Sequence, residues 1–226
     1  MRQSYTSVVY NETRTPITKY PDQLAGYLIH RFELKPGNRL LELGCGRGDF
    51  ISAFKRAGLS CAGVDREPAS IPGIEVRKCD LSKDPLPFED ESFDVVYHKS
   101  VIEHLYQPDH IMDETYRILK KGGKLIFLTP DWERQLKTFY EDITHCRPYN
   151  VTAVKDTLSM WEMQDILAEK FYQYPLFWRW PILKFLGLLF NPFISVKLAR
   201  WYTRKTNKKF FQFSIETMVL GYGKKK

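Results

Sequence analysis

An acidic residue followed by glycines at alternate positions is the first pattern in the sequence that could do chemistry. Glu42 closes a run of aliphatic residues, and Gly44, Gly46 and Gly48 follow it before an amphipathic stretch. Glycine lets the backbone approach a ligand closely and adopt angles that a side chain forbids. Because open α/β proteins bind ligands at the carboxyl ends of their strands, the pattern predicts a ligand site at this turn.

The charge of this turn indicates which ligand it suits. Dinucleotide-binding turns follow the pattern G-x-G-x-x-G and seat a pyrophosphate on a helix N-terminus. Here the third glycine, Gly48, comes one place early, and Asp49 stands where that pattern has Gly or Ala. Glu42 adds a negative charge, which disfavours a pyrophosphate and suits a ligand with a sulfonium and an ammonium group. We therefore expect S-adenosylmethionine rather than NAD.

Two further acidic residues end the next two aliphatic runs. Asp65 lies about twenty residues after the glycines, where an acid can accept hydrogen bonds from both hydroxyls of a ribose. Asp80 can similarly accept a hydrogen bond from the exocyclic amine of adenine. The alternative is that both acids are helix caps or loop residues that bind no ligand.

Short aliphatic runs alternate with amphipathic stretches from Arg39 onward, which is typical of βαβ units and a parallel sheet. The apolar spacing predicts helices over 50–57 and 108–120. The expected strands of this doubly wound sheet are 39–43, 60–65, 74–79, 93–98 and 124–128.

The alternation loosens beyond Thr129. The pattern there predicts a helix over 161–170, a strand over 171–176 and a final strand over 211–222. Between the last two lies an insertion, residues 177–210, which is rich in Trp, Phe, Leu and basic residues. We expect the insertion to form helices that cover the substrate pocket.

Five motifs, taken in order, resemble those of the class I S-adenosylmethionine-dependent methyltransferases. They are E-L-G-C-G-x-G at 42–48, V-D at 64–65, D-L at 80–81, F-D-V-V-x-x-x-x-V-I-E-H-L at 93–105 and L-K-x-G-G at 119–123. The resemblance covers roughly residues 20–130 strongly and the rest weakly. It implies a Rossmann-like three-layer α/β sandwich with a seven-stranded, mostly parallel sheet, an antiparallel last strand and a helical insertion before that strand.

The same resemblance implies one methyltransferase domain over residues 1–226. Its parts would be an N-terminal helical lid segment (1–38), a cofactor-binding core (39–130) and an acceptor-side half (131–226) that contains the insertion. Glu42, Gly44 and Gly46 would hold the methionine part of the cofactor, Asp65 the ribose, and Asp80 with Leu81 the adenine. The residues that complete the implied cofactor site are Cys45, Arg66, His98 and Lys99, the last two bordering the methyl group.

The resemblance implies no universal catalytic residue, because methyl transfer is an in-line displacement that depends mainly on proximity and alignment. A hydroxyl acceptor would need a base, and His98 and His145 are the candidates by residue type. Residues 141–148 resemble an acidic-Thr-His-Arg-Pro segment that lines the acceptor side in some relatives. His104 is interpreted as a packed or capping histidine, and no metal is implied.

The net charge of +7 arises in the C-terminal quarter, where residues 170–226 hold 12 of the 34 Lys and Arg and a single acidic residue, Glu216. The longest uncharged stretch of the insertion, 185–196, has 12 residues, whereas crossing a bilayer takes about 20. Three interpretations stay open for the insertion: a cap over the substrate cleft, contact of 177–205 with a membrane or lipid substrate, and contact with nucleic acid.

The sequence therefore predicts an enzyme that methylates an oxygen or nitrogen of a small molecule, glycan or lipid-linked metabolite. The alternatives are an RNA or protein methyltransferase that uses the basic C-terminal region, and a cofactor-binding protein without turnover. Residues 1–16 lack the features of a secretory signal, so we expect a cytoplasmic protein, with peripheral contact to a membrane surface left open. The four cysteines form no C-x-x-C pair, which disfavours a structural zinc site and a disulfide framework.

Overall fold

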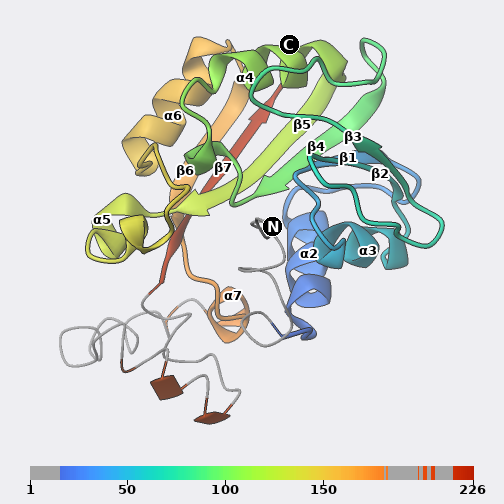
Figure 1. Ribbon diagram of the computed structural model, residues 1–226. Helices are drawn as coiled ribbons and strands as arrows, with labels where there is room; N and C mark the ends of the chain where they lie inside the picture. Colours follow the sequence, from blue (N-terminus) through green and yellow to red (C-terminus); the bar gives the residue numbers. More distant parts are fainter. Residues whose placement is uncertain (1–15, 181, 183–197, 199–200, 203–204, 207–215) are drawn as a thin grey trace, which may run out of the picture.

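The computed structural model describes residues 16–180, 182, 198, 201–202, 205–206 and 216–226. Its centre is a seven-stranded sheet in the order β3-β2-β1-β4-β5-β7-β6 (Figure 1). The strands are β1 (Arg39–Leu43), β2 (Ser60–Asp65), β3 (Glu75–Lys78), β4 (Phe93–Lys99), β5 (Leu119–Pro130), β6 (Gln164–Phe171) and β7 (Met218–Lys224).

The strand directions confirm the expected fold class. β1 pairs in parallel with β2 and β4, β2 with β3, and β4 with β5. β7 runs antiparallel to both of its neighbours, β5 and β6. The chain thus builds the sheet outward from β1 in one direction and from β4 in the other, and a ligand site is expected where the direction of build-up reverses.

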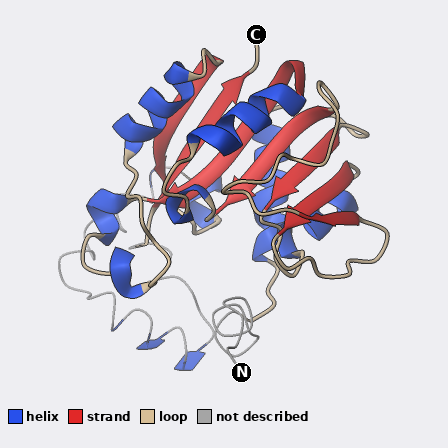
Figure 2. Cartoon of the chain, turned by 45° about the horizontal axis from the view of Figure 1, so that its top comes forward, coloured by secondary structure: helices blue, strands red, loops and turns tan. Residues whose placement is uncertain are grey.

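Helices cover both faces of the sheet and complete a three-layer sandwich (Figures 1 and 2). α2 (Tyr20–Arg31) and α3 (Asp49–Arg56) pack on one face, where Leu40, Tyr97 and Ile126 point. α4 (Asp109–Ile118) and α6 (Val151–Met160) pack on the other, against Leu41 and Val96. Alternate residues of β1, β4 and β5 therefore enter two separate hydrophobic clusters, as a buried strand with helices on both faces requires.

Four short helical segments lie in the loops between residues 100 and 180. Two are single 3₁₀ turns, η1 (Ile102–His104) after β4 and η2 (Phe139–Glu141). The other two are α5 (Trp132–Gln135) after β5, and α7 (Leu176–Arg179) after β6. Of these, η1, α5 and η2 follow the carboxyl ends of β4 and β5, so this edge of the sheet is surrounded by loop residues.

The helix expected over 161–170 was a wrong prediction, because most of this stretch forms strand β6. The helix instead lies one element earlier, as α6, whose N-cap Asn150 accepts a hydrogen bond from the backbone N–H of Ala153 at 2.9 Å. β6 contains Leu, Ala, Glu and Lys, which favour helices, but it pairs with β7 from Gln164 to Phe171. Pairing within the sheet overrides a helix propensity worth only tenths of a kcal/mol per residue.

The strand expected over 171–176 was also wrong. Only Phe171 belongs to a strand, and α7 begins at Leu176. β5 starts at Leu119 rather than 124, with a bulge in its pairing to β4, so the glycines at 122–123 lie inside the strand. The final strand is present but shifted to Met218–Lys224, and most of the insertion, together with 207–215, lies outside the described residues.

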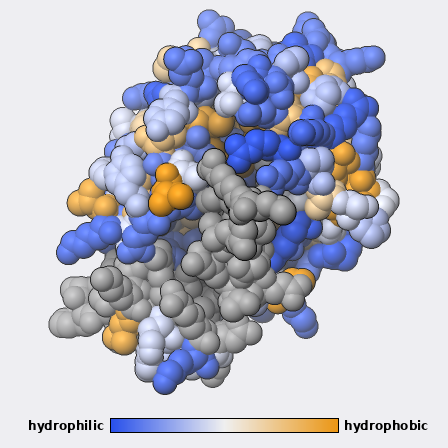
Figure 3. Space-filling view, viewed as in Figure 1, coloured by the Kyte–Doolittle hydropathy of each residue, from blue (hydrophilic) through white to orange (hydrophobic). Residues whose placement is uncertain are grey.

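Within the part of the chain that the structure describes, no helix combines the length and the apolar character needed to cross a membrane. On the face shown in Figure 3, hydrophobic side chains of this part form separate spots among hydrophilic ones. Among the described residues of the insertion, four large apolar side chains are nevertheless exposed by more than half: Trp180, Ile182, Leu198 and Trp201.

The close packing of β7 against β5 and α6 gives a test of the fold. A Cβ added at Gly221 would lie 2.5 Å from the Phe127 ring and 2.9 Å from Val154. Gly221→Ala should therefore lower the free energy of unfolding by about 1–3 kcal/mol, the usual cost of overpacking a core. Urea denaturation followed by circular dichroism measures this change.

Gly26 in α2 provides the matched control, because no described atom lies within 4 Å of a Cβ added there. Gly26→Ala should raise the free energy of unfolding by about 0.5–1 kcal/mol, since alanine loses less backbone entropy in a helix. Equal stabilities for Gly221→Ala and the wild-type protein would contradict the close packing of β7 at this position.

Candidate functional site

The turn between β1 and α3 has the backbone that its glycines predict. Gly44, Gly46 and Gly48 all have positive φ angles, of 65°, 52° and 89°. A Cβ at Gly44 would lie 2.8 Å from Cγ2 of Val101, so this glycine is needed for close packing as well as for its angle. A Cβ at Gly46 would meet no described atom within 4 Å, so the described residues leave room beside the backbone there. The turn can therefore present its backbone to a ligand.

Glu42 stands beside this turn in an environment that penalises its charge. Its side chain is 3% exposed, and Oε2 has no hydrogen-bond partner among the described residues. Burial raises the pKa of Glu42 well above its ordinary range, although the backbone N–H of Ile51 in the first turn of α3 acts to lower it. A buried carboxyl oxygen without a partner is costly, and a cationic ligand group would satisfy it.

Asp65 connects the end of β2 to the glycine turn. Its Oδ2 accepts a hydrogen bond of 2.9 Å from the backbone N–H of Gly46. Its Oδ1 accepts one of 2.9 Å from the backbone N–H of Glu67. Each carboxylate oxygen can accept a further bond. Asp65 therefore shapes the turn and still retains acceptor capacity toward a ligand.

Asp80 follows β3 and is also tied to its own loop. Its Oδ1 accepts hydrogen bonds from the Ser82 backbone N–H at 3.1 Å and the Ser82 hydroxyl at 2.7 Å. The Ser82 hydroxyl is the main cause of a lowered pKa at Asp80, so this acid is ionised at neutral pH. Its local role matches the loop-acid alternative, and its unoccupied acceptor sites leave the ligand role open.

The remaining cofactor candidates differ in position. Leu81 packs near Gly44 and is 9% exposed, whereas Arg66 is exposed to solvent. Cys45 is buried, and burial raises the pKa of its thiol to about 12, which leaves no reactive thiolate at neutral pH. Lys99, at the end of β4, places its Nζ 5.7 Å from the centre of the Phe50 ring.

His98 is buried in the sheet. Its ring stacks on Phe127 with 4.8 Å between ring centres, it is 4% exposed, and Nδ1 has no hydrogen-bond partner among the described residues. Burial lowers the pKa of His98 to about 3, so the imidazole is uncharged at neutral pH. A group that resists protonation this strongly is a weak base. The structure therefore favours a lining role for His98 over proton transfer.

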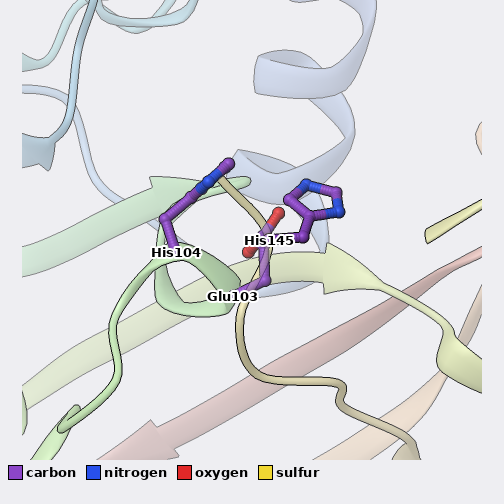
Figure 4. Close-up of side chains that lie close together, drawn as sticks. All are labelled: Glu103, His104 and His145. Carbon is purple, nitrogen blue, oxygen red and sulfur yellow. The ribbon is translucent and has the colours of Figure 1, made fainter. Parts of the chain in front are cut away.

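Two histidines and a glutamate come together after the end of β4 (Figure 4). Glu103 and His104 belong to η1, and His145 comes from the segment between η2 and α6. The backbone N–H groups of Cys146 and Arg147 both donate to the Glu103 carbonyl oxygen, at 2.9 and 3.1 Å. These two bonds hold the distant segment against η1. The two imidazole ring centres are 4.8 Å apart.

Glu103 is the residue of this group that the sequence interpretation missed. It is fully buried, Thr129 Oγ1 donates to its Oε2 at 3.0 Å, and Oε1 makes no hydrogen bond of ordinary geometry with the described residues. Burial raises the pKa of Glu103 to about 7, with weaker opposing effects from its own backbone, Thr129 and Ser100. The available signal was an acid inside the apolar run V-I-E-H-L, where a charge is expensive unless it has a purpose.

Both parts of the site lie at the same edge of the sheet. Val101, which contacts Gly44, stands two residues before Glu103, so the glycine turn and η1 are adjacent. Ser100 between β4 and η1 adopts a left-handed φ of 57°, a strained conformation for a residue with a side chain. Because β1 and β4 flank the point where strand order reverses, this is the expected ligand edge.

A cavity of about 670 Å³ lies elsewhere, at the amino ends of the strands, where Arg39, Arg77 and Arg117 contribute to its lining. Its position next to the start of β1 separates it from the glycine turn. We assign the functional site to the carboxyl edge, because the buried unpaired acids and the open glycine backbone are there.

Residues 41–127 match the family model described as "Methyltransferase domain". A relative in Mycolicibacterium vanbaalenii named "Uncharacterized methyltransferase" is 34% identical over 110 residues, covering 44% of this chain and 42% of the relative. One in Mycolicibacterium smegmatis, named "Probable S-adenosylmethionine-dependent methyltransferase", is 32% identical over 102 residues, covering 42% and 39%. The matched segments thus span less than half of the length of these relatives.

Among solved structures, the chain is similar to the Haemonchus contortus phosphoethanolamine N-methyltransferase 2 in complex with S-adenosyl-L-methionine. The TM-score is 0.66 at 18% sequence identity, and the match covers 97% of this chain and 58% of the Haemonchus chain. At this identity the similarity concerns the fold.

The burial of His98 predicts a specific dependence of stability on pH. Histidine in the unfolded chain has a pKa near 6.5. Below that pH the unfolded chain therefore binds a proton at His98, whereas the folded protein binds it only when the pH falls to about 3. The stability contributed by neutral His98 should be complete above pH 6.5 and decline as pH falls toward 3, by about 2 kcal/mol between pH 6.5 and 5.

Urea denaturation of wild-type protein and His98→Leu at pH 6.5 and pH 5 measures this contribution. The variant should lose about 2 kcal/mol less than the wild-type protein over that interval, because it lacks the titrating ring. Equal losses in the two proteins would show that His98 is protonated in the folded state.

Proposed function

We propose that this chain, whose central part is a class I S-adenosylmethionine-dependent methyltransferase domain, transfers the methyl group of S-adenosylmethionine to an oxygen or nitrogen of a small molecule, glycan or lipid-linked metabolite. The observation that carries the proposal is the buried Glu42 carboxyl, whose Oε2 lacks a partner among the described residues beside the open backbone of Gly46. S-adenosylmethionine, when bound, supplies a methyl group activated by an adjacent sulfonium.

The residues present fit a cationic nucleoside. Glu42 would accept hydrogen bonds from its ammonium group, and the backbone around Gly44 and Gly46 would approach its methionine part. Asp65 would bind the ribose hydroxyls with its remaining lone pairs, and Asp80 with Leu81 would contact the adenine. The other members of the proposed cofactor site are Cys45, which packs beneath the turn, and Arg66, His98 and Lys99 at its border.

On the acceptor side, the geometry supports His145 over His98. The Nδ1 of His145 lies 2.7 Å from the Phe139 carbonyl oxygen, which can only accept, so this nitrogen carries the proton. In the neutral ring the lone pair is then on Nε2 of His145, which can take a proton. His145 is half-buried and thus reachable, whereas His98 is enclosed.

The exposed apolar residues of the insertion support an acceptor with a lipid part as one member of the proposed class. Trp180, Ile182, Leu198 and Trp201 are each more than half exposed in a segment with many basic residues. Exposed Trp and Leu beside Lys and Arg suit the interface of a membrane. The proposal therefore keeps peripheral membrane contact through 177–205 together with a lipid-linked acceptor, and nucleic acid as the weaker alternative.

The role of Glu42 can be tested by isothermal titration calorimetry with S-adenosylmethionine. Glu42→Gln should weaken binding by about 1.5–3 kcal/mol, because it removes the charged acceptor. The same variant should keep the unfolding free energy of the ligand-free protein within about 1 kcal/mol, because burial favours the uncharged form of the wild-type group. Asp65→Ala should weaken binding by about 1–3 kcal/mol.

The control for this titration is Asp156→Ala, which removes an exposed acid from α6 and should leave the affinity unchanged. NAD⁺ should not bind to the wild-type protein measurably under the same conditions. Preference for NAD⁺, or wild-type affinity in both site variants, would refute the cofactor assignment.

The acceptor class can be tested with methyl-labelled S-adenosylmethionine and the full chain. Label should enter a small-molecule and lipid extract, and transfer to an uncharged acceptor should persist between 50 and 200 mM salt. Transfer to total RNA that falls steeply over that range would favour the nucleic-acid alternative, because phosphate contacts weaken with salt. Binding of the labelled cofactor without transfer to any fraction would favour a binding protein without turnover.

A further inference from the structure

We propose that Glu103, His104 and His145 form a binding site for a divalent first-row transition-metal ion. The three side chains come from η1 and from the segment before α6, and they converge on one space (Figure 4). Two imidazoles with one carboxylate form a ligand set that suits zinc and its neighbours in the first transition row.

The spacing of the three groups is compatible with a single ion. One potential ligand atom from each residue lies within 4.8 Å of the other two. Bonds of about 2.1 Å in a tetrahedral arrangement place ligand atoms about 3.4 Å from each other. The two half-buried histidines would have to turn and bring their ring nitrogens closer by up to about 1.4 Å to close the site.

The surrounding hydrogen bonds orient both imidazoles as metal sites usually require. Metal-bound histidines commonly donate their other ring N–H to a carbonyl or a polar group, which fixes the tautomer. His145 does this with Nδ1 toward the Phe139 carbonyl oxygen at 2.7 Å. The Nδ1 of His104 lies 2.8 Å from Thr144 Oγ1, and Thr144 Oγ1 lies 2.7 Å from Asp142 Oδ1.

The Asp142 carboxylate determines which groups donate in the hydrogen bonds that join His104, Thr144 and Asp142. Asp142 Oδ1 can only accept when ionised, so the Thr144 hydroxyl donates to it and accepts from Nδ1–H of His104. Both histidines are thereby held in the tautomer whose Nε2 carries the lone pair. Two separate partners have the same effect on two neighbouring rings, which packing alone would not require.

Glu103 supplies an independent observation that points to a ligand. Its side chain is fully buried, and Oε1 lacks a hydrogen bond of ordinary geometry with the described residues, while Thr129 satisfies Oε2. Leaving a buried carboxyl oxygen without a partner costs free energy. An ion held between this carboxylate and the two histidines would compensate that cost.

A metal ion at this position would narrow the acceptor class, a consequence that rests on the proposed function. An ion there can take an acceptor hydroxyl as a further ligand and lower its pKa, which favours oxygen over nitrogen acceptors. The proton of the acceptor hydroxyl would leave to solvent, and the acceptor oxygen would form the new bond to the methyl carbon. The electron pair of the broken C–S bond stays on sulfur, which becomes a neutral thioether.

The test is calorimetric titration of the full chain with Zn²⁺ after chelator treatment, without S-adenosylmethionine. Wild-type protein should bind a single ion per chain. His145→Ala should bind it at least about 100-fold more weakly, a larger loss than removal of a group that only orients a ligand usually causes. His30→Ala is the matched control, because His30 is exposed on α2, outside the cluster. Its affinity for zinc should equal that of the wild-type protein.

Thr144→Val adds a variant that keeps all three ligands and removes only the hydroxyl that orients His104. It should weaken zinc binding by about 10–100-fold and leave the thermal unfolding midpoint near the wild-type value. Co²⁺ provides a second readout, since the wild-type complex should show a visible absorption band that His145→Ala lacks.

Equal zinc affinity in wild-type protein and His145→Ala, or no binding by either, would overturn the site and leave a hydrogen-bonded acid–base cluster without an ion. Because the titration contains no S-adenosylmethionine, this result is independent of the proposed methyl transfer. Failure of the proposed function would instead appear as absent S-adenosylmethionine binding or absent label transfer, with zinc binding intact.

Discussion

Two carboxyl groups that are kept out of water, each with one oxygen unpaired among the described residues, constrain the whole carboxyl edge of the sheet. Glu42 and Glu103 are 3% and 0% exposed. Burial raises the pKa of both, so the fold stores an unfavourable desolvation at two neighbouring points. Charged or polar ligand groups are the natural partners for such atoms. The described residues alone leave these two oxygens without a hydrogen bond, so this edge of the sheet is suited to a ligand.

The sheet can tolerate these groups because the apolar layers on either side are complete. Leu41 and Leu43 flank Glu42 in β1 and enter the cluster under α4, while Leu40 enters the cluster under α2 and α3. Burial of such side chains contributes about 1.5–3 kcal/mol each, enough for one strand to offset an unpaired oxygen at its end. The desolvation cost of the Glu42 carboxyl is confined to the end of β1, where a hydrogen bond or charge from a ligand can offset it.

The sequence predicted the parts of the fold that local signals determine. β1, β2 and the glycine turn follow from aliphatic runs and glycine spacing, and β2 has the predicted bounds. β6 could not be predicted in this way, since its residues favour a helix and only its pairing with β7 makes it a strand. The same limit applies to His98, whose residue type suggested a base and whose burial disfavours that role.

The cluster of Glu103, His104 and His145 could not be predicted from the sequence, because it brings together two segments that are distant in the chain. The bonds from the Cys146 and Arg147 backbone N–H groups to the Glu103 carbonyl oxygen, together with the contact of Thr144 with His104, hold His145 near Glu103.

Gly44 links the cluster to the glycine turn. Its positive φ shapes the turn, and its missing side chain leaves the space that Val101 fills just before η1. A larger residue there would distort the turn and push η1 away, so one glycine positions the residues on both sides of the site.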